Sequence, residues 1–222
     1  MTRAALFDVD GTLVDTNYLH VTAWWEAFHQ AGHTVAMPAI HRAIGLGSED
    51  LIAHLLGPGR DGDRDAGIGA THSALYATYF ERLPPLDGAA DLLRALAGRG
   101  WTIVLATSAS GPELEALRGA LDADDVISGT ASSDDVDQGK PAPDPIRHAM
   151  EIAGATPEDT VYIGDSVWDM EAANRASVAA VGLLSGGIPR ADLEAAGAVE
   201  IHESPAALLA RLDTGVIARM TP

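Results

Sequence analysis

Two aspartates lie two residues apart at the end of an apolar run near the N-terminus. Residues 4–7 are Ala-Ala-Leu-Phe, a predicted strand, and Asp8 and Asp10 follow, with Gly11 next in the chain. Because residues i and i+2 of an extended chain project to the same side, we expect both carboxylates beside one small cavity. Two carboxylates about 4 Å apart repel by about 4 kcal/mol at an effective dielectric of ~20. A cation, a shared proton or a substrate must offset that repulsion, unless the segment is only a solvated acidic turn.

Three later segments carry further polar side chains directly after a predicted strand or at the start of a turn or helix. They are Thr107 and Ser108 after residues 101–106, Lys140 in the turn at 139–144, and Asp165 and Asp169 after residues 161–163. In an open parallel sheet, ligands bind outside the carboxyl ends of the strands. The sequence therefore predicts that these segments and the first acid pair converge on one site.

In this order the four segments resemble the motifs of the haloacid dehalogenase superfamily, and the resemblance covers residues 3–12 and 101–184. It implies an α/β fold with a Rossmann-like parallel sheet core, helices on both faces and an inserted α-helical cap of the C1 type. The branch it points to contains phosphoglycolate phosphatases and β-phosphoglucomutases. The chemistry it implies is phosphoryl transfer through an aspartyl-phosphate, since carboxylates do serve as covalent nucleophiles.

The resemblance also implies a role for each acid. Asp8 attacks phosphorus, while Asp10 protonates the leaving oxygen and then takes a proton from water. Mg²⁺ is held by Asp8, the backbone carbonyl of Asp10 and Asp165, and Asp169 binds it directly or orients one of its waters. The alternatives for the last two are a helix N-cap at Asp165 and a solvated helix residue at Asp169.

The phosphoryl group is expected to be held by Thr107, Ser108 and Lys140. Thr107 would use its hydroxyl and its backbone amide, and Lys140 would act as a point charge that stabilises the transition state. Their structural alternatives are a strand-end cap and a surface lysine before a turn.

Asp10 separates branches within the superfamily. The resemblance implies that dehalogenases lack this second acid, and that phosphonate-cleaving relatives carry alanine there and use a lysine of the cap. Residues 16–83 contain no lysine. Asp10 therefore favours a phosphate ester as substrate, and we expect a phosphatase acting on a small phosphorylated metabolite.

The composition agrees with an enzyme of that kind. The 222 residues carry 32 acidic and 14 basic side chains, a net charge of −18, which argues against binding nucleic acid or an anionic membrane. No apolar run reaches the ~18 residues of a membrane span, and the N-terminus has no signal-peptide pattern, so we expect a cytoplasmic protein. The chain has no cysteine, which excludes disulfides and thiolate metal sites. Nothing in the sequence indicates the oligomeric state.

Helical patterns and breakers predict the cap. After a first helix that ends at Gly32, helices are expected at residues 39–44, 49–56 and 70–82, with a mobile loop at 57–69. The predicted domains are a core of residues 1–15 and 84–222 and a cap of residues 16–83. His20 and Arg42 are the cap side chains that we expect at the substrate entrance.

Strands and helices alternate in the rest of the chain, as in a parallel sheet with helices on both faces. The strands are expected at residues 101–106, 125–128, 161–163, 178–184 and 199–202, and the helices at 89–97, 112–121, 144–153, 168–176, 191–196 and 205–212.

Two other functions are compatible with parts of the pattern. A β-phosphoglucomutase-like sugar-phosphate mutase would need a cationic side chain of the cap that binds a second phosphate. However, Ser48 falls where we align the arginine of the mutase pattern, and residues 108–111 lack the lysine of the mutase loop. A receiver-type signalling module also combines acids, threonine and lysine, but it carries its acid pair and its phosphorylated aspartate on different strands and has no helical insertion. Both remain alternatives to the phosphatase.

Overall fold

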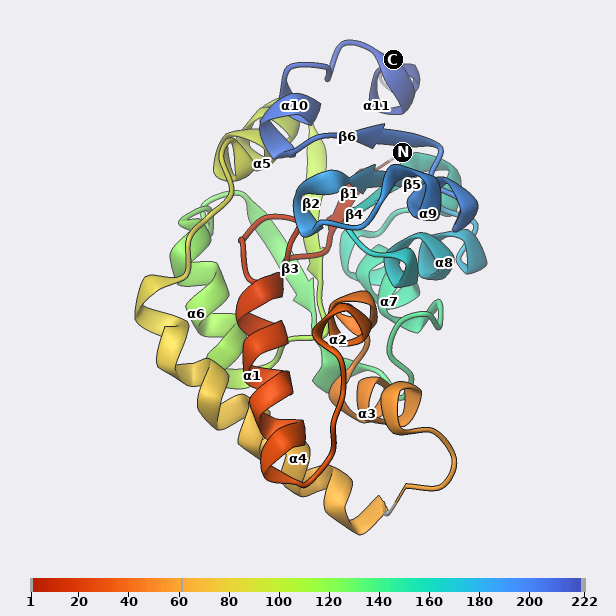
Figure 1. Ribbon diagram of the computed structural model, residues 1–222. Helices are drawn as coiled ribbons and strands as arrows, with labels where there is room; N and C mark the ends of the chain where they lie inside the picture. Colours follow the sequence, from red (N-terminus) through yellow and green to blue (C-terminus); the bar gives the residue numbers. More distant parts are fainter. Residues whose placement is uncertain (1, 61, 221–222) are drawn as a thin grey trace.

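Six parallel strands form a single sheet in the computed structural model, which describes residues 2–60 and 62–220 (Figure 1). Their order across the sheet is β3-β2-β1-β4-β5-β6. The strands are β1 (Arg3–Phe7), β2 (Trp101–Ala106), β3 (Ile127–Ala131), β4 (Thr160–Gly164), β5 (Ala179–Leu183) and β6 (Glu200–His202). This order is the one found in Rossmann folds, so the predicted core architecture is confirmed.

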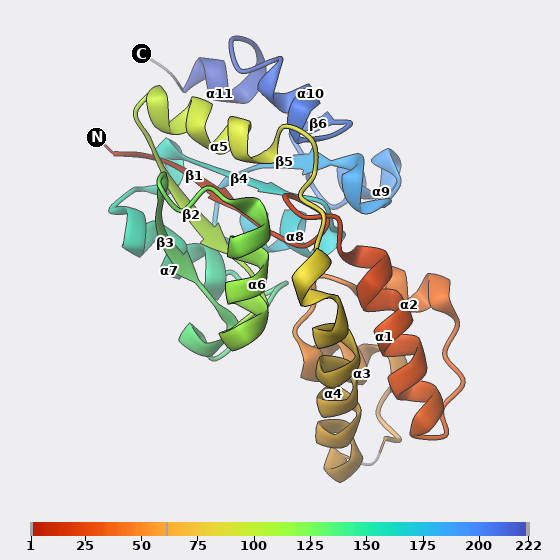
Figure 2. The same cartoon turned by 90° about the vertical axis from the view of Figure 1, so that its left-hand side faces the viewer.

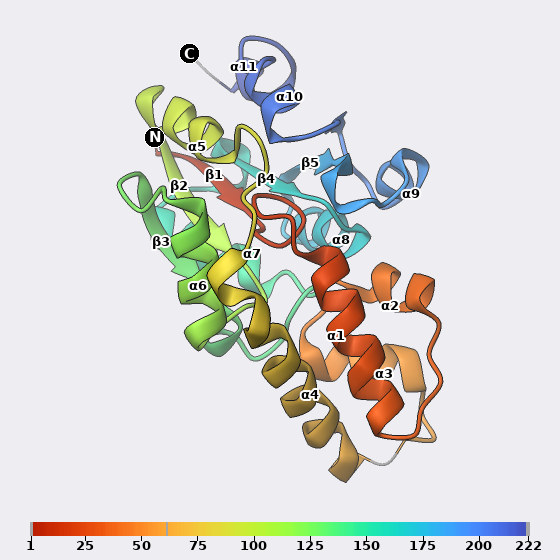
Figure 3. The same cartoon turned by 60° about the vertical axis from the view of Figure 1, so that its left-hand side comes forward.

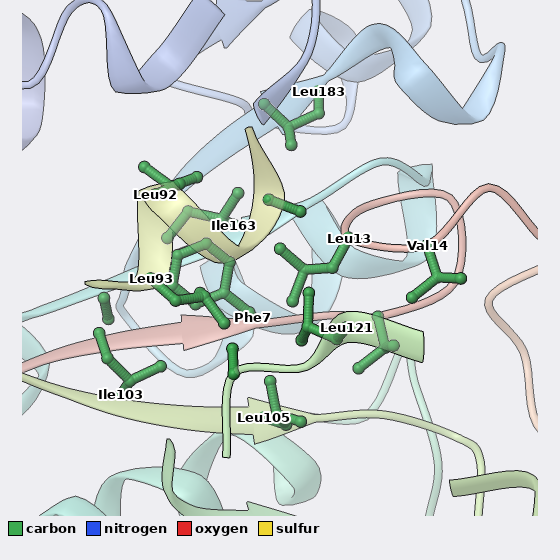
Figure 4. Packing of buried hydrophobic residues seen from close by; sticks show 14 of the residues in the cluster. Phe7, Leu13, Val14, Leu92, Leu93, Ile103, Leu105, Leu121, Ile163 and Leu183 are labelled. Carbon is green, nitrogen blue, oxygen red and sulfur yellow. The ribbon is translucent and has the colours of Figure 1, made fainter. Parts of the chain in front are cut away.

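Strand β1 lies between β2 and β4, and its side chains alternate between two apolar clusters. Ala5 and Phe7 belong to the cluster on one face, part of which Figure 4 shows, and Ala4 and Leu6 to the cluster on the other. The first face is covered by α5 (Ala89–Gly98), α6 (Gly111–Leu121), α10 (Pro205–Leu209) and α11 (Gly215–Arg219), the second by α7 (Asp144–Ala153), α8 (Val167–Arg175) and α9 (Arg190–Ala195). Because β1 is buried on both faces from Ala4 to Phe7, these four residues are all apolar, and only Arg3 at its start is charged.

The helices between β1 and α5 form a layer of their own beyond the carboxyl ends of the strands (Figures 2 and 3). They are α1 (Asn17–Gln30), α2 (Met37–Ala43), α3 (Ser48–Leu56) and α4 (Gly62–Tyr76), and the 3₁₀ helix η1 (Ala77–Arg82) leads back to the sheet. This layer has its own apolar core, in which Trp24, Phe28 and Ile52 are buried.

The loop predicted at residues 57–69 is wrong from residue 62 onward, because α4 begins at Gly62. Glycine and charge lower the helix propensity of this stretch, but Ile68 is buried in the core of the helical layer. Tertiary packing therefore stabilises a helix that the local sequence does not favour. The helix expected up to residue 82 changes at Ala77 into a 3₁₀ helix.

Most predicted elements of the sheet region agree with the structure to within two residues. The strand expected at 125–128 instead spans Ile127–Ala131, so that its end lies level with the end of β2. The helix expected at 205–212 ends at Leu209, and α11, which we did not predict, follows it. Short 3₁₀ turns also occur at η2 (Ser133–Asp135), η3 (Pro157–Asp159) and η4 (Leu184–Gly186).

Within residues 2–60 and 62–220, none of the helices combines the length and the apolar character needed to cross a membrane.

Candidate active site

Asp8 lies at the end of the central strand and is almost fully buried. Its backbone N–H donates a hydrogen bond of 2.9 Å to the carbonyl of Ile163 in β4, which keeps it in register with the sheet. The chain then turns at Gly11, where φ is +73° and a Cβ would overlap Asn17 and Asp165. This position requires glycine both for its backbone conformation and for the close approach of the two side chains.

Lys140 joins two of the predicted acids. Its Nζ lies 2.6 Å from Oδ1 of Asp8 and 2.8 Å from Oδ1 of Asp169, and its side chain is only 1% exposed. Burial alone would lower the pKa of Lys140, but Asp169 and Asp8 raise it above the usual value, so the ammonium stays charged. Burial raises the pKa of Asp8 to about 7, although Lys140 favours its carboxylate form. The lysine is thus a buried part of the site, and the alternative of a surface residue is wrong.

Both carboxylate oxygens of Asp169 are already hydrogen-bonded. Oδ1 accepts from the Tyr162 hydroxyl at 2.8 Å, and Oδ2 accepts from the backbone N–H and the hydroxyl of Ser166 at 3.0 and 2.6 Å. Burial opposes the charged form, but Lys140 and these donors hold the pKa of Asp169 below its usual value. Asp169 is therefore a fixed anion that holds Lys140 in place.

Asp165 follows β4 and accepts hydrogen bonds from two residues that follow β1. Its Oδ1 accepts from the Thr12 hydroxyl at 3.1 Å, and its Oδ2 accepts from the Asn17 amide at 2.7 Å. Burial, followed by the charges of Asp8 and Asp169, raises the pKa of Asp165 well above the usual range. Within residues 2–60 and 62–220 no basic side chain forms an ion pair with Asp165, so a cation bound beside it would relieve this cost.

The three buried acids have the geometry of a cation site. One oxygen each from Asp8, Asp165 and Asp169 lies within 4.8 Å of the others. Oδ1 of Asn17, which is buried beside Asp165, has no hydrogen-bond partner among the described residues. A purely oxygen donor set with excess negative charge suits Mg²⁺, so the residues present fit the metal that the sequence predicts.

Asp10 points toward the helical layer. Its Oδ1 accepts a hydrogen bond of 2.5 Å from the Thr16 hydroxyl and lies 3.2 Å from Nε2 of His20. Burial opposes ionisation, but His20 and Thr16 hold the pKa of Asp10 below its usual value. The same contact raises the pKa of His20 against the effect of its own burial. A proton shared between Asp10 and His20 therefore resides on His20. It lies next to the Asp10 carboxylate, which is expected to protonate the leaving oxygen.

His20 also contacts two residues that the sequence did not indicate. Its Nε2 lies 3.6 Å from Oε1 of Glu113, and its Nδ1 lies 3.1 Å from Nε2 of His72. Burial lowers the pKa of His72 to about 2 and raises that of Glu113 to about 7. His72 is thus neutral and accepts from His20, and it is stacked on Trp24 with ring centroids 3.9 Å apart.

Two adjoining cavities open beside these groups. A cavity of about 50 Å³ is lined by Asp8, Asp10 and His20, and one of about 390 Å³ is lined by Thr107 and Lys140. The residues that line both are Gly47, Ser48, Ser108 and Glu113. The predicted phosphoryl-binding residues therefore line a cavity that adjoins the one lined by the acid pair.

The proposed contribution of the Thr107 backbone amide is wrong, because that N–H donates to the carbonyl of Ala131 at 3.1 Å. Its hydroxyl oxygen accepts from the N–H of Ala109 at 3.0 Å, which leaves the hydroxyl hydrogen available to a ligand.

Arg42 does not line either cavity, so its assignment to the substrate entrance is wrong. Its guanidinium is largely exposed and forms an ion pair of 2.8 Å with Asp192. The sequence indicated a basic residue in the helical layer but not the direction of its side chain.

Several residues of the site were missed by the sequence analysis. Asn17 and Thr12 follow the first acid pair closely, so their proximity was a usable signal. Glu113 is in the first turn of α6, directly after the segment with Thr107 and Ser108. His72 had no comparable signal, since only the packing of α4 against α1 brings it next to His20.

The strand order defines a Rossmann-like α/β fold with a helical insertion and with buried acids after β1 and β4. The profile of the haloacid dehalogenase-like hydrolases matches residues 2–177. The chain belongs to this family.

Individual proteins that resemble this chain agree with its assignment to the family. A phosphoglycolate phosphatase of Pseudomonas putida is 30% identical over 190 residues, covering 83% of this chain and 70% of that protein. A hydrolase from Pseudomonas syringae has a similar crystal structure, with a TM-score of 0.91, 35% identity and coverage of 96% of this chain and 98% of that one. The β-phosphoglucomutase of Clostridium difficile shares the fold, with a TM-score of 0.80, 19% identity and coverage of 92% of each chain. The predicted superfamily is therefore confirmed.

Proposed function

We propose that this chain is a magnesium-dependent phosphatase that hydrolyses a small phosphorylated metabolite through an aspartyl-phosphate on Asp8. The observation that carries the proposal is the buried cluster of Asp8, Lys140, Asp165 and Asp169, with Asp10 in the adjoining cavity. Family membership and the phosphatase among its relatives support the same reaction.

The proposed reaction has two steps. A carboxylate oxygen of Asp8 attacks phosphorus, the bond between phosphorus and the leaving oxygen breaks, and Asp10 gives that oxygen a proton. Water then attacks the phosphorus of the aspartyl-phosphate, Asp10 takes a proton from the water, and Asp8 is released with inorganic phosphate. The proton that Asp10 needs for the first step is supplied by His20, which holds one 3.2 Å away.

Around the transferred group, Lys140 and the hydroxyls of Thr107 and Ser108 would bind the phosphoryl oxygens, and Asp169 would keep Lys140 oriented. Asp8, the backbone carbonyl of Asp10 and Asp165 would hold Mg²⁺, with Asp169 acting on the metal directly or through water. Bound there, the metal would screen the negative charges of nucleophile and phosphate from each other.

We propose further that residues 16–83 act as a cap domain on a core of residues 1–15 and 84–222, and that the enzyme works in the cytoplasm. Between these parts lies the expected substrate space, since Ser48 of the helical layer and Ser108 of the sheet region line the same cavities.

Hydrolysis is favoured over a mutase reaction because the position aligned with the phosphate-binding arginine of the mutase pattern carries no cationic side chain. Ser48, aligned with the arginine of the mutase pattern, is the first residue of α3 and lines both cavities. Losing one charged hydrogen bond costs roughly 1.5–3 kcal/mol. A sugar bisphosphate would then be held poorly, and water would take the phosphoryl group first.

The test is to screen phosphorylated metabolites with Mg²⁺ for phosphate release, using wild type, Asp8→Asn and Asp87→Asn. We expect Asp8→Asn to fold and release no phosphate, because an amide cannot attack phosphorus, whereas Asp87→Asn changes an exposed acid and should keep full activity. Turnover by folded Asp8→Asn would refute the mechanism.

A second assay supplies β-glucose 1-phosphate with catalytic bisphosphate and follows glucose 6-phosphate and free phosphate together. Rapid isomerisation with little phosphate release would identify a mutase instead.

A further inference from the structure

The smaller cavity begins at Asp10, the proposed proton donor to the leaving oxygen, so the leaving group must extend into this space or its continuation. The charges on its walls therefore bear on which leaving groups the enzyme accepts. The following inference rests on the proposed phosphatase function.

The acidic side chains around the two cavities greatly outnumber the basic ones. Beyond the catalytic acids, the lining contains Glu113, Glu49, Asp50 and Asp137. No arginine is among the described residues that line either cavity. Lys140, the sole lysine of the sequence, is held by Asp8 and Asp169 and is needed for the phosphoryl group.

The histidines do not supply a free cation either. His20 lies between the carboxylates of Asp10 and Glu113, so its positive charge is already more than balanced. His72 is 4% exposed and accepts from His20 through Nε2. Its Nδ1 therefore carries the hydrogen, and this donor has no partner among the described residues.

We propose that the enzyme selects phosphate monoesters whose leaving group is an uncharged, hydroxyl-bearing alcohol, and that Glu113 discriminates against leaving groups carrying a carboxylate. A carboxylate in this cavity would face Glu113, whose one neighbouring cation, His20, is already shared with Asp10, and like charges brought together in a partly buried site are unfavourable. A hydroxyl group can donate a hydrogen bond to the Glu113 carboxylate, which a carboxylate group cannot do. The preferred substrate would thus differ from the one named for the phosphoglycolate phosphatase relative.

The test compares kcat/KM for two esters of similar size, 2-hydroxyethyl phosphate and carboxymethyl phosphate (phosphoglycolate). The assays use saturating Mg²⁺ at pH 8, where Glu113 is ionised because its pKa is about 7. We expect the carboxylate ester to be hydrolysed with at least about tenfold lower kcat/KM by the wild type. Equal values, or a preference for the carboxylate ester, would overturn the inference.

The variant Glu113→Gln keeps the size of the side chain and removes its charge. It should shift the ratio of the two kcat/KM values at least about threefold toward unity. Glu115→Gln is the matched control, since Glu115 is an exposed acid on the same helix and lines neither cavity, and it should keep the wild-type ratio. If Glu113 acted only by supporting His20, both rates would fall by the same factor and the ratio would stay unchanged, which would also overturn the inference.

Failure of the inference is distinguishable from failure of the proposed function. p-Nitrophenyl phosphate, run in parallel, reports phosphatase activity whatever the preference between the two esters. No turnover of this reporter or of either ester would refute the phosphatase itself, whereas turnover with the wrong preference refutes only the role given to Glu113.

Discussion

Asp10 combines a position suited to general acid catalysis with a pKa below its usual value. An acid of this kind must receive its proton from a neighbour, and His20 is the group that holds one at 3.2 Å. In the proposed mechanism, His20 thus stores the proton and Asp10 delivers it.

Asp10→Asn should therefore impair hydrolysis in a way that depends on the leaving group. An alkoxide leaving group needs protonation, so alkyl phosphates should lose at least about 100-fold in kcat, the usual contribution of a general acid. p-Nitrophenolate needs little protonation, and its ester should lose much less. Steady-state kinetics on both esters checks this, and an equal loss on the two would argue against the acid role.

His72 provides a pH-dependent test of the packing around the site. Its pKa is about 2 in the folded protein, below the 6.5 of the unfolded chain, because burial disfavours the charged ring and His20 adds to the effect. The unfolded state then binds more protons than the folded state below pH 6.5, so the stability that neutral His72 contributes is lost as the pH falls from 6.5 toward 2.

The variant His72→Gln removes this titration. Relative to it, the wild type should lose about 2 kcal/mol of unfolding free energy between pH 7.5 and pH 5, at 1.36 kcal/mol per pH unit below 6.5. Urea denaturation at the two pH values measures the difference, with His29→Gln, an exposed histidine of α1, as control. A difference that does not change with pH would show that His72 is charged in the folded protein.

Short connections after the strands hold the acids at the scale of secondary structure. The turn η4 follows β5 and packs directly on Asp165, and its Gly186 carbonyl accepts hydrogen bonds from Asn17 and His41 at 3.2 and 2.7 Å. A Cβ at Gly186 would overlap the Asp165 carboxylate. The turn therefore supports the proposed metal site without providing a ligand to it.

Gly186→Ala should accordingly weaken metal binding while leaving the fold intact. Displacing Asp165 should raise the Mg²⁺ concentration for half-maximal activity by about tenfold, the lower range for changes to groups that orient metal ligands. Gly98→Ala, at the end of α5, is the control because a Cβ there meets nothing within 4 Å. An unchanged Mg²⁺ requirement in Gly186→Ala would show that Asp165 is not a ligand.

At the scale of the whole molecule, the buried acids should make stability depend on the proposed metal. Asp8 and Asp169 share the ammonium of Lys140, Asp165 forms no such ion pair among the described residues, and repulsion among the three acids disfavours the folded state at neutral pH. A bound divalent cation relieves this repulsion only in the folded protein, and it therefore shifts the equilibrium toward folding.

Mg²⁺ at about 100 times its Kd should add about 2.7 kcal/mol of unfolding free energy, a rise in Tm of roughly 5–10 °C for a chain of this size. Thermal scans with and without chelator measure it. Ca²⁺ should also raise Tm but inhibit turnover, because its longer bonds and higher coordination number would misdirect Asp8. A Tm that is insensitive to Mg²⁺, or full activity in chelator, would exclude the proposed site.

The amino-acid sequence by itself determined the parts of this protein that depend on local pattern. The apolar run before Asp8 predicts a buried strand, and the polar residues Thr107, Lys140 and Asp165 follow strand or turn signals that parallel sheets bring to one edge. The family and the sheet architecture could therefore be predicted, and both agree with the structure and the comparisons.

Only the tertiary structure decided which side chains face the cavities. Arg42 turns to Asp192, the Thr107 amide is used by the sheet, and α4 forms where the local sequence favours a loop, because packing outweighs helix propensity there. Glu113 and His72 meet His20 from helices that are far apart in the sequence. The charge around the leaving group depends on such long-range contacts, which no local pattern of residues specifies.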